Sequence, residues 1–186
     1  MNYGFFRTAC ASTQLVVADC NFNADKIIDA VRNSASEGAS LVVFPEFSIT
    51  GYTCGDLFLQ RALQKSAVEN LERIAAKTAS LDCIIAVGLP INVENAIYNC
   101  AAVLYHGKIL ALIPKTFIPN YSEFYERRYF TPASSSVPSS IRLSEKNPSV
   151  PFGTDILVCD ENNPDFVLGV ELCEDLWVTL PPSTRA

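Results

Sequence analysis

Two kinds of hydrophobic pattern alternate along the chain. Short runs of consecutive apolar residues, LVVF at 41–44 and CIIAVGLPI at 83–91, are typical of strands buried on both faces of a sheet. Apolar residues spaced three and four apart instead predict helices, one from Asn23 to Gly38 and a longer one over 57–79. The first helix aligns Ile27, Ile28, Val31 and Ala35, and the second aligns Leu63, Ala67, Leu71, Ile74 and Thr78.

Further apolar segments complete the predicted sheet. A first strand leads into a loop within 5–17, and the segments 99–105 and 108–114 form a hairpin around the turn Tyr-His-Gly-Lys. The last two strands are expected at 155–160 and 166–172. Helices that alternate with strands and are followed by a hairpin predict an α/β fold, with mixed sheets and helices packed outside.

Length and composition limit the possible functions. At 186 residues the chain suits one domain, 1–186, or part of a larger one, and we expect strands and helices beyond Ala186 to be missing. A net charge of −6 without a basic cluster argues against nucleic-acid and anionic-membrane partners. No signal peptide or membrane-length apolar run is seen, and the seven cysteines include no CxxC pair. These features predict reduced thiols, a cytoplasmic protein and no metal site.

The chain has one histidine, His106, which lies in the predicted hairpin turn. An exposed turn histidine cannot serve as the base of a Ser-His-Asp or Cys-His mechanism. A hydrolytic nucleophile in this chain would therefore need a carboxylate or a lysine as its partner.

Three apolar strands each end at a residue that could carry chemistry: Glu46, Lys115 and Cys173. Ligands of open α/β sheets bind beyond the carboxyl ends of strands, so residues far apart in sequence can meet there. Singly, each is as easily a strand-end charge or a buried thiol. Together they provide a general base, an electrostatic stabiliser and a nucleophile. The acidic residues around Cys173 are unfavourable to a thiolate, so its activation must come from elsewhere in the chain.

Three sequence blocks carry a family resemblance. FPEFSITGY, PKTFIPNYSEFYERRYF and GVELCEDLW resemble, in order and spacing, the motifs of the nitrilase (carbon–nitrogen hydrolase) superfamily. The variants CGDLF, PNYSEFYE and CEDLWV are similar to the N-terminal glutaminase domain of glutamine-dependent NAD synthetases. The resemblance covers essentially the whole chain. It implies an α-β-β-α sandwich whose C-terminal part is missing here.

The resemblance also implies roles for individual residues. Glu46 matches the general base, Lys115 the catalytic lysine and Cys173 the nucleophile of a Cys-Lys-Glu triad. Glu123 matches the second glutamate, which orients the lysine. The implied reaction releases ammonia from L-glutamine through a γ-glutamyl thioester on Cys173.

Other implied features concern substrate and partners. The backbone N–H of Glu174 is expected to hold the oxyanion, while Tyr121 contacts glutamine and Trp177 lines the pocket. The glutaminase step needs no cofactor. ATP and Mg are expected only in a C-terminal synthetase domain, which amidates deamido-NAD to NAD and is not present here. A homo-oligomer is also expected.

Two other functions stay open at this stage. A stand-alone amidase of the same superfamily would act on a different small amide. A catalytically silent module would only assemble an oligomer, but such a module has no physical need for Glu46, Lys115 and Cys173 together. The chain has no GxGxxG or GxxxxGK[ST] phosphate loop.

Overall fold

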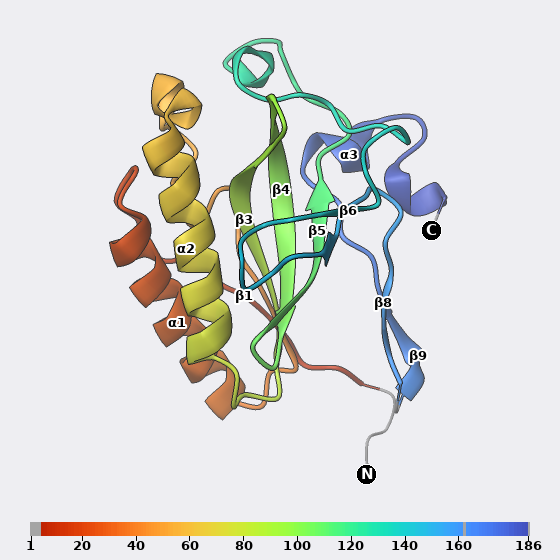
Figure 1. Cartoon of the computed structure of the whole chain (residues 1–186). Helices are drawn as coiled ribbons and strands as arrows, with labels where there is room; N and C mark the ends of the chain where they lie inside the picture. The colour runs from red at the N-terminus through yellow and green to blue at the C-terminus, as the bar shows by residue number, and fades with distance from the viewer. Residues whose placement is uncertain (1–4, 162, 186) are drawn as a thin grey trace.

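The computed structural model describes residues 5–161 and 163–185, and its centre is a five-stranded mixed sheet (Figure 1). The strands follow the order of the sequence from β1 to β5, with β1 to β3 parallel and β3 to β5 antiparallel. They are β1 (Thr8–Cys10), β2 (Leu41–Val43), β3 (Ile84–Val93), β4 (Ala96–Tyr105) and β5 (Lys108–Pro114). The α/β class with a mixed sheet is therefore confirmed.

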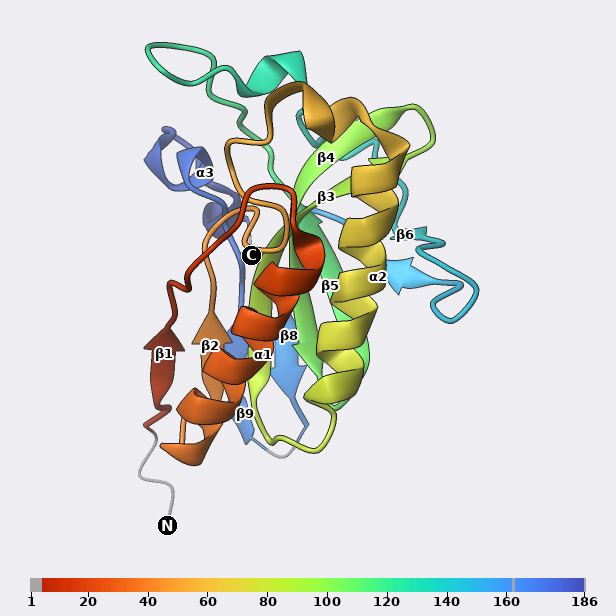
Figure 2. The same ribbon diagram turned by 90° about the vertical axis from the view of Figure 1, so that its left-hand side faces the viewer.

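Two helices cover one face of this sheet (Figure 2). They are α1 (Cys20–Ser36) and α2 (Arg61–Lys77), and a short 3-10 helix, η1 (Gly55–Leu59), precedes the second. The aligned apolar side chains of both helices pack into the core beneath them, as their spacing predicts, with Ala35 only partly buried.

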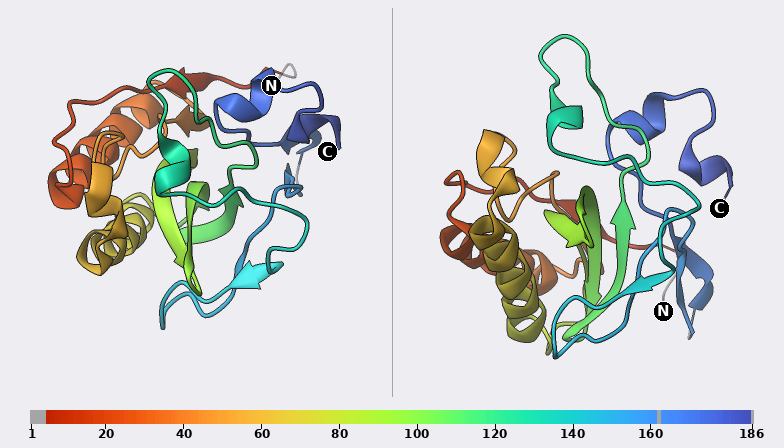
Figure 3. Two further views of the ribbon diagram at one scale, coloured as in Figure 1. Left: turned by 90° about the horizontal axis from the view of Figure 1, so that it is seen from above. Right: turned by 45° about the horizontal axis from the view of Figure 1, so that its top comes forward.

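The C-terminal third of the chain packs partly on the opposite face of the sheet and partly beside its edge strand β5 (Figure 3). Its strands are β6 (Ser140–Ile141), β7 (Val150–Pro151), β8 (Val158–Asp160) and β9 (Asn163–Leu168), which form two two-stranded sheets. The short helices are η2 (Glu126–Arg128), α3 (Glu174–Trp177) and η3 (Pro182–Thr184). Among the described residues, no helix is long and apolar enough to cross a membrane.

Side chains of β4 belong to cores on both faces of the sheet. Cys100, Ala102 and Leu104 belong to the core that the helices cover. Ala101 and Val103 belong to a smaller core that Leu172 also enters. Successive side chains of a strand point to opposite faces, so a continuous apolar run fits this sheet buried on both sides.

Several predicted boundaries are wrong by a few residues. The first helix begins at Cys20 because Asp19 caps it, accepting a hydrogen bond from Phe22 N–H at 3.0 Å. Asn23 lies inside the helix, where its amide bonds the backbone of Val16 and Ile49. The long second helix is split into η1 and α2.

The predicted strands at the two ends of the chain are longer than the observed ones. The segment 5–17 contains only the three residues of β1, and β9 ends at Leu168 instead of 172. Residues 169–172 therefore approach Cys173 as irregular backbone. The hairpin is confirmed: His106 and Gly107 have φ of 44° and 79°, as a two-residue turn requires. His106 lies at the opposite end of β5 from Lys115, about 20 Å along the strand.

Gly88 of β3 fixes how closely the loop after β2 approaches the sheet. A Cβ atom on Gly88 would lie 2.4 Å from Phe47 N and 2.8 Å from Glu46 Cα. The loop is also bonded to this glycine, because Gly88 N–H donates to Ser48 Oγ and Gly88 C=O accepts from Ile49 N–H. Glu46 is thus seated directly against the middle of β3.

We expect Gly88→Ala to destabilise the protein by about 1–3 kcal/mol, because the loop carrying Glu46 must move outward to admit the methyl group. Urea denaturation would measure the change. Gly153→Ala is the matched control, since its Cβ would meet nothing closer than 3.4 Å. Equal stability of Gly88→Ala and wild type would contradict the close approach.

Candidate active site

Lys115 is the buried centre of the candidate site. It follows β5 directly, and its side chain is 0% exposed. The ammonium Nζ lies 3.1 Å from Glu46 Oε1 and 3.0 Å from Glu126 Oε2. Burial alone would lower the pKa of Lys115, but the charges and hydrogen bonds of the two glutamates outweigh it, so the pKa is raised. Lys115 is therefore a fixed cation.

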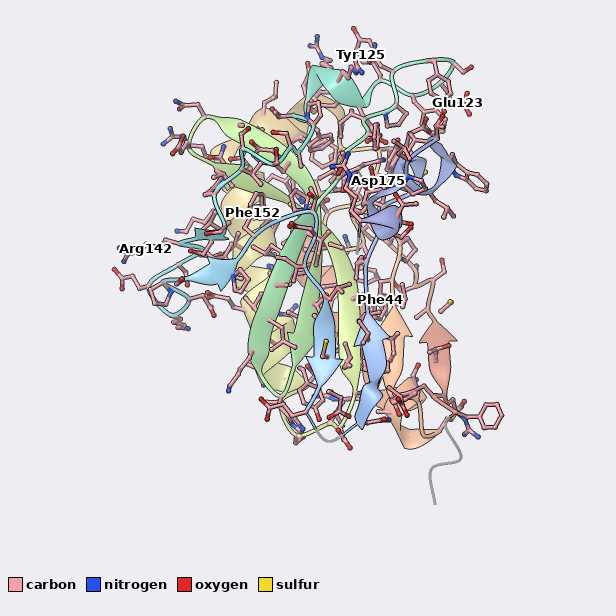
Figure 4. The ribbon with its side chains drawn as sticks, turned by 90° about the vertical axis from the view of Figure 1, so that its right-hand side faces the viewer. Phe44, Glu123, Tyr125, Arg142, Phe152 and Asp175 are labelled. Carbon is pink, nitrogen blue, oxygen red and sulfur yellow. The ribbon has the colours of Figure 1, made fainter. Side chains whose placement is uncertain are left out.

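The second glutamate on the lysine is Glu126, which corrects the prediction of Glu123. Glu126 is buried in η2 and contacts Lys115 through both carboxylate oxygens. Glu123 is exposed on the preceding loop, away from the strand ends (Figure 4). Both glutamates lie between lysine and cysteine in the sequence, and the irregular loop between them has no period that could indicate which one turns inward.

Two uncharged side chains complete the surroundings of the carboxylates. Tyr52 Oη donates to Glu126 Oε1 at 2.7 Å, and Asn99 Nδ2 donates to Glu46 Oε2 at 2.8 Å. The pKa of Tyr52 is raised by burial and by its bond to Glu126, so the phenol stays a donor. Neither residue was singled out from the sequence, although a polar Asn99 in the apolar run 96–105 was an available signal.

Cys173 occupies a strained position at the start of α3. Its φ of 45° and ψ of −97° lie outside the regions that a residue with a side chain ordinarily adopts. Such strain persists only where surrounding contacts hold the backbone, and it is concentrated at functional sites. The turn presents Cys173 on the surface, whereas the neighbouring Leu172 is buried.

Asp175 supplies the contacts that hold this turn. It is buried, and its carboxylate accepts N–H bonds from Thr116, Phe117 and Leu172. The segment that follows Lys115 is thereby tied to the segment that carries Cys173, 58 positions away. Asp175 lies near the upper ends of the strands in Figure 4. The sequence offered it only as an acidic neighbour of the cysteine.

The Cys173 thiol is held in its protonated form. Although the residue is exposed, partial desolvation of its thiol raises the pKa most, Glu46 raises it further, and Lys115 acts in the opposite direction. The charges of Glu126 and Glu174 also raise it. The acidic surroundings noted in the sequence therefore act as physical chemistry predicts, and the thiol needs a base at the moment of attack.

Glu46 and Cys173 border one cleft of about 280 Å³. Apolar side chains of β2, β3 and β4 and the backbone of Gly88 form its walls. A larger cavity of about 600 Å³ lies near the hairpin turn and β8–β9, and none of the three candidate residues lines it. The smaller cleft is the candidate substrate site because both Glu46 and Cys173 line it.

The remaining predicted residues lie at the surface beside the nucleophile. Tyr121 Oη donates to Glu174 Oε2 at 2.8 Å, and this bond raises the tyrosine pKa. Trp177 is 75% exposed and does not line the cleft, which departs from the prediction. The Glu174 N–H is the first of α3, a position whose donor has no partner within the helix.

In the described part of the chain, no group of His, Cys, Asp and Glu could hold a metal ion.

The sequence as a whole matches a known family. Residues 7–182 match the model of the carbon–nitrogen hydrolase family. The chain belongs to that family. It is 37% identical over 184 residues to the glutamine-dependent NAD(+) synthetase of Mycobacterium tuberculosis, and 31% identical over 180 residues to the human enzyme of that name. These alignments cover 99% and 93% of the chain but only 27% and 25% of the relatives.

Solved structures show the same relationship. The glutamine-dependent NAD(+) synthetase of Cytophaga hutchinsonii superposes with a TM-score of 0.81 and 28% identity, covering 91% of this chain and 28% of that one. An amidase from Nesterenkonia sp. superposes with a TM-score of 0.59 and 23% identity, covering 73% and 51%. The second likeness shows the fold alone. The chain thus has a nitrilase-type fold and spans about a quarter of the length of its curated relatives.

We expect Glu126→Gln to lower the free energy of unfolding by about 1–3 kcal/mol, because a buried carboxylate that binds Lys115 and Tyr52 loses its charge. Glu123→Gln, the matched exposed control, should change it by less than about 0.5 kcal/mol. Urea denaturation of both variants tests the assignment. A larger loss of stability in Glu123→Gln than in Glu126→Gln would mean that Glu123 is the partner of Lys115.

The alkylation rate of Cys173 tests its electrostatics. Because Glu46 raises the Cys173 pKa, Glu46→Gln should lower that pKa and speed iodoacetamide labelling at pH 7.5, where the thiolate is the reacting form. Mass spectrometry of the Cys173 peptide gives the rate, and the exposed Cys159 in the same digest is the internal reference. Slower labelling would contradict this expectation. It would mean that Glu46 speeds alkylation by taking the thiol proton more than it slows it by raising the thiol pKa.

Proposed function

We propose that the chain is a glutaminase domain that releases ammonia from L-glutamine with Cys173 as nucleophile, Glu46 as base and Lys115 as electrostatic stabiliser. The observation that carries the proposal is the buried Lys115 held by two carboxylates, one of which shares a cleft with Cys173. Similarity over nearly the whole chain to proteins named glutamine-dependent NAD(+) synthetases supports glutamine as the substrate.

The first half of the reaction forms a thioester. Glu46 takes the thiol proton as Cys173 sulfur bonds to the carboxamide carbon, and the carbonyl oxygen becomes an oxyanion. The Lys115 ammonium and the Glu174 N–H stabilise that charge, each by about 3–4 kcal/mol in comparable sites. Glu46 then returns the proton to the departing nitrogen as the C–N bond breaks. Ammonia and a γ-glutamyl thioester result.

The second half regenerates the thiol. Water gives a proton to Glu46 and attacks the thioester carbon, which forms a second oxyanion at the same donors. The C–S bond breaks, glutamate leaves and Cys173 recovers its proton. A resting cysteine held as a thiol suits this scheme because the proton it supplies is the one the leaving nitrogen needs.

Lys115 serves both halves without changing its charge. Both glutamates raise its pKa against the effect of burial, and the charge of Glu126 remains beside it while Glu46 is protonated. Glu126 supports this role: it holds Nζ from the other side, so the lysine stays in place when Glu46 is neutral.

The proposal includes partners outside this chain. The ammonia is supplied to a synthetase domain that uses ATP and Mg to amidate deamido-NAD to NAD, and the glutaminase step itself needs no cofactor. The names of the relatives support a synthetase partner. A homo-oligomer and a cytoplasmic location stay predictions from the sequence.

Ammonia release from glutamine by the natural full-length protein tests the proposal. Cys173→Ala should abolish turnover because no other group can form the thioester. Lys115→Ala should reduce it at least about a thousandfold, because the oxyanion loses its cation. Cys159→Ala, which removes another exposed thiol, is the control and should keep wild-type activity. Near-normal hydrolysis by Cys173→Ala would refute the assignment.

The same assay separates the other two functions. A stand-alone amidase would hydrolyse a short aliphatic amide such as propionamide faster than glutamine. A silent module would hydrolyse neither, and its Cys173 would not be labelled by a glutamine-like diazoketone. Either result would replace the glutaminase proposal.

A further inference from the structure

Asn99 is the one residue of β4 that bonds to both Glu46 and Lys115. Its backbone C=O accepts the Lys115 N–H at 2.8 Å, where β5 ends. Its side-chain Nδ2 donates to Glu46 Oε2 at 2.8 Å. Two residues 69 positions apart in the sequence are therefore held by one residue of a central strand.

The chemistry of the amide fixes which way the side chain faces. A carboxylate only accepts hydrogen bonds, so Nδ2 must point at Glu46. The opposite orientation would place two acceptor oxygens within 2.8 Å of each other. The amide of Asn99 thus recognises the ionised form of Glu46.

This arrangement is unfavourable for folding alone. Asn99 is 0% exposed, and its Oδ1 is buried with no hydrogen-bond partner among the described residues. A buried carbonyl oxygen without a partner costs about 1–3 kcal/mol, roughly what a hydrogen bond to a charged group contributes. An apolar side chain of the same size would avoid the cost, so stability does not explain the asparagine.

We propose that Asn99 is a positioning residue, which fixes the Glu46 carboxylate in the orientation needed to exchange protons at Cys173. Lys115 cannot do this alone, because Nζ lies 3.1 Å from one oxygen of Glu46 and 3.3 Å from the other. A cation placed almost equally between two oxygens does not distinguish one from the other. The bond from Asn99 to Oε2 distinguishes the two oxygens and leaves Oε1 as the one without an amide donor.

The inference rests on the proposed glutaminase function, and Asn99→Leu tests it. Leucine keeps the size and the backbone bond to Lys115 but removes the donor and the unpartnered oxygen. We expect kcat for glutamine to fall about 10- to 100-fold with KM unchanged, because a misplaced base slows only the chemical step. The urea midpoint should stay at or above the wild-type value.

Asn70→Leu is the matched control, because Asn70 is also a buried asparagine but belongs to α2 and bonds Asn21 and Ser66. It should lower the urea midpoint and leave kcat of the folded protein unchanged. Wild-type kcat in Asn99→Leu would overturn the inference. So would a fall in both urea midpoint and kcat, since that result indicates a structural role.

A crystal structure of Asn99→Leu separates this inference from the proposed function. We expect the Glu46 carboxylate to turn away from its wild-type orientation, whether or not the protein hydrolyses glutamine. An unmoved Glu46 would overturn the inference alone. Absence of glutaminase activity in the wild type, with a displaced Glu46 in the variant, would overturn only the proposed function.

Discussion

The burial of one ammonium group sets the requirements for the rest of the site. Lys115 lies at the end of β5, an edge strand of the five-stranded sheet, and its side chain is fully buried. An unpaired charge there would cost several kcal/mol. The cost is offset by Glu46 and Glu126, which approach from opposite directions along the chain. Each glutamate also accepts a hydrogen bond from an uncharged side chain, Glu126 from Tyr52 and Glu46 from Asn99. Removing either glutamate would leave the Lys115 ammonium with one carboxylate only.

The position of the nucleophile depends on a second, separate set of bonds. Asp175 joins the backbone beyond Lys115 to the backbone before Cys173, so the lysine and the thiol share one rigid frame. The strained φ of Cys173 is sustained by that frame. The charge of Glu46 raises the pKa of the Cys173 thiol and so disfavours the thiolate. The same carboxylate is close enough to act as a base toward that thiol. The acidic residues around Cys173 are therefore compatible with its proposed role as the nucleophile.

The sequence predicted the elements whose pattern repeats. Runs of consecutive apolar residues predicted the inner strands. The spacing of Ile27, Ile28 and Val31 predicted which face of the first helix is buried. The turn at His106 was predictable because a two-residue hairpin needs positive φ, which glycine supplies. The predicted ends of helices were wrong where a side chain outside the apolar pattern sets the end, as Asp19 does by capping the first helix.

The sequence alone determined the class of fold, since hydrophobic period is a local property, and it singled out Glu46, Lys115 and Cys173, although only Lys115 directly follows a strand. Only the tertiary structure decided which side chains meet them. Glu123 and Glu126 differ by three positions in an irregular loop, and burial beside Lys115 alone distinguishes them. Asn99, Asp175 and Gly88 follow the same principle: each acts by contact with a distant segment. Such contacts depend on strand order and loop approach, which no local pattern encodes.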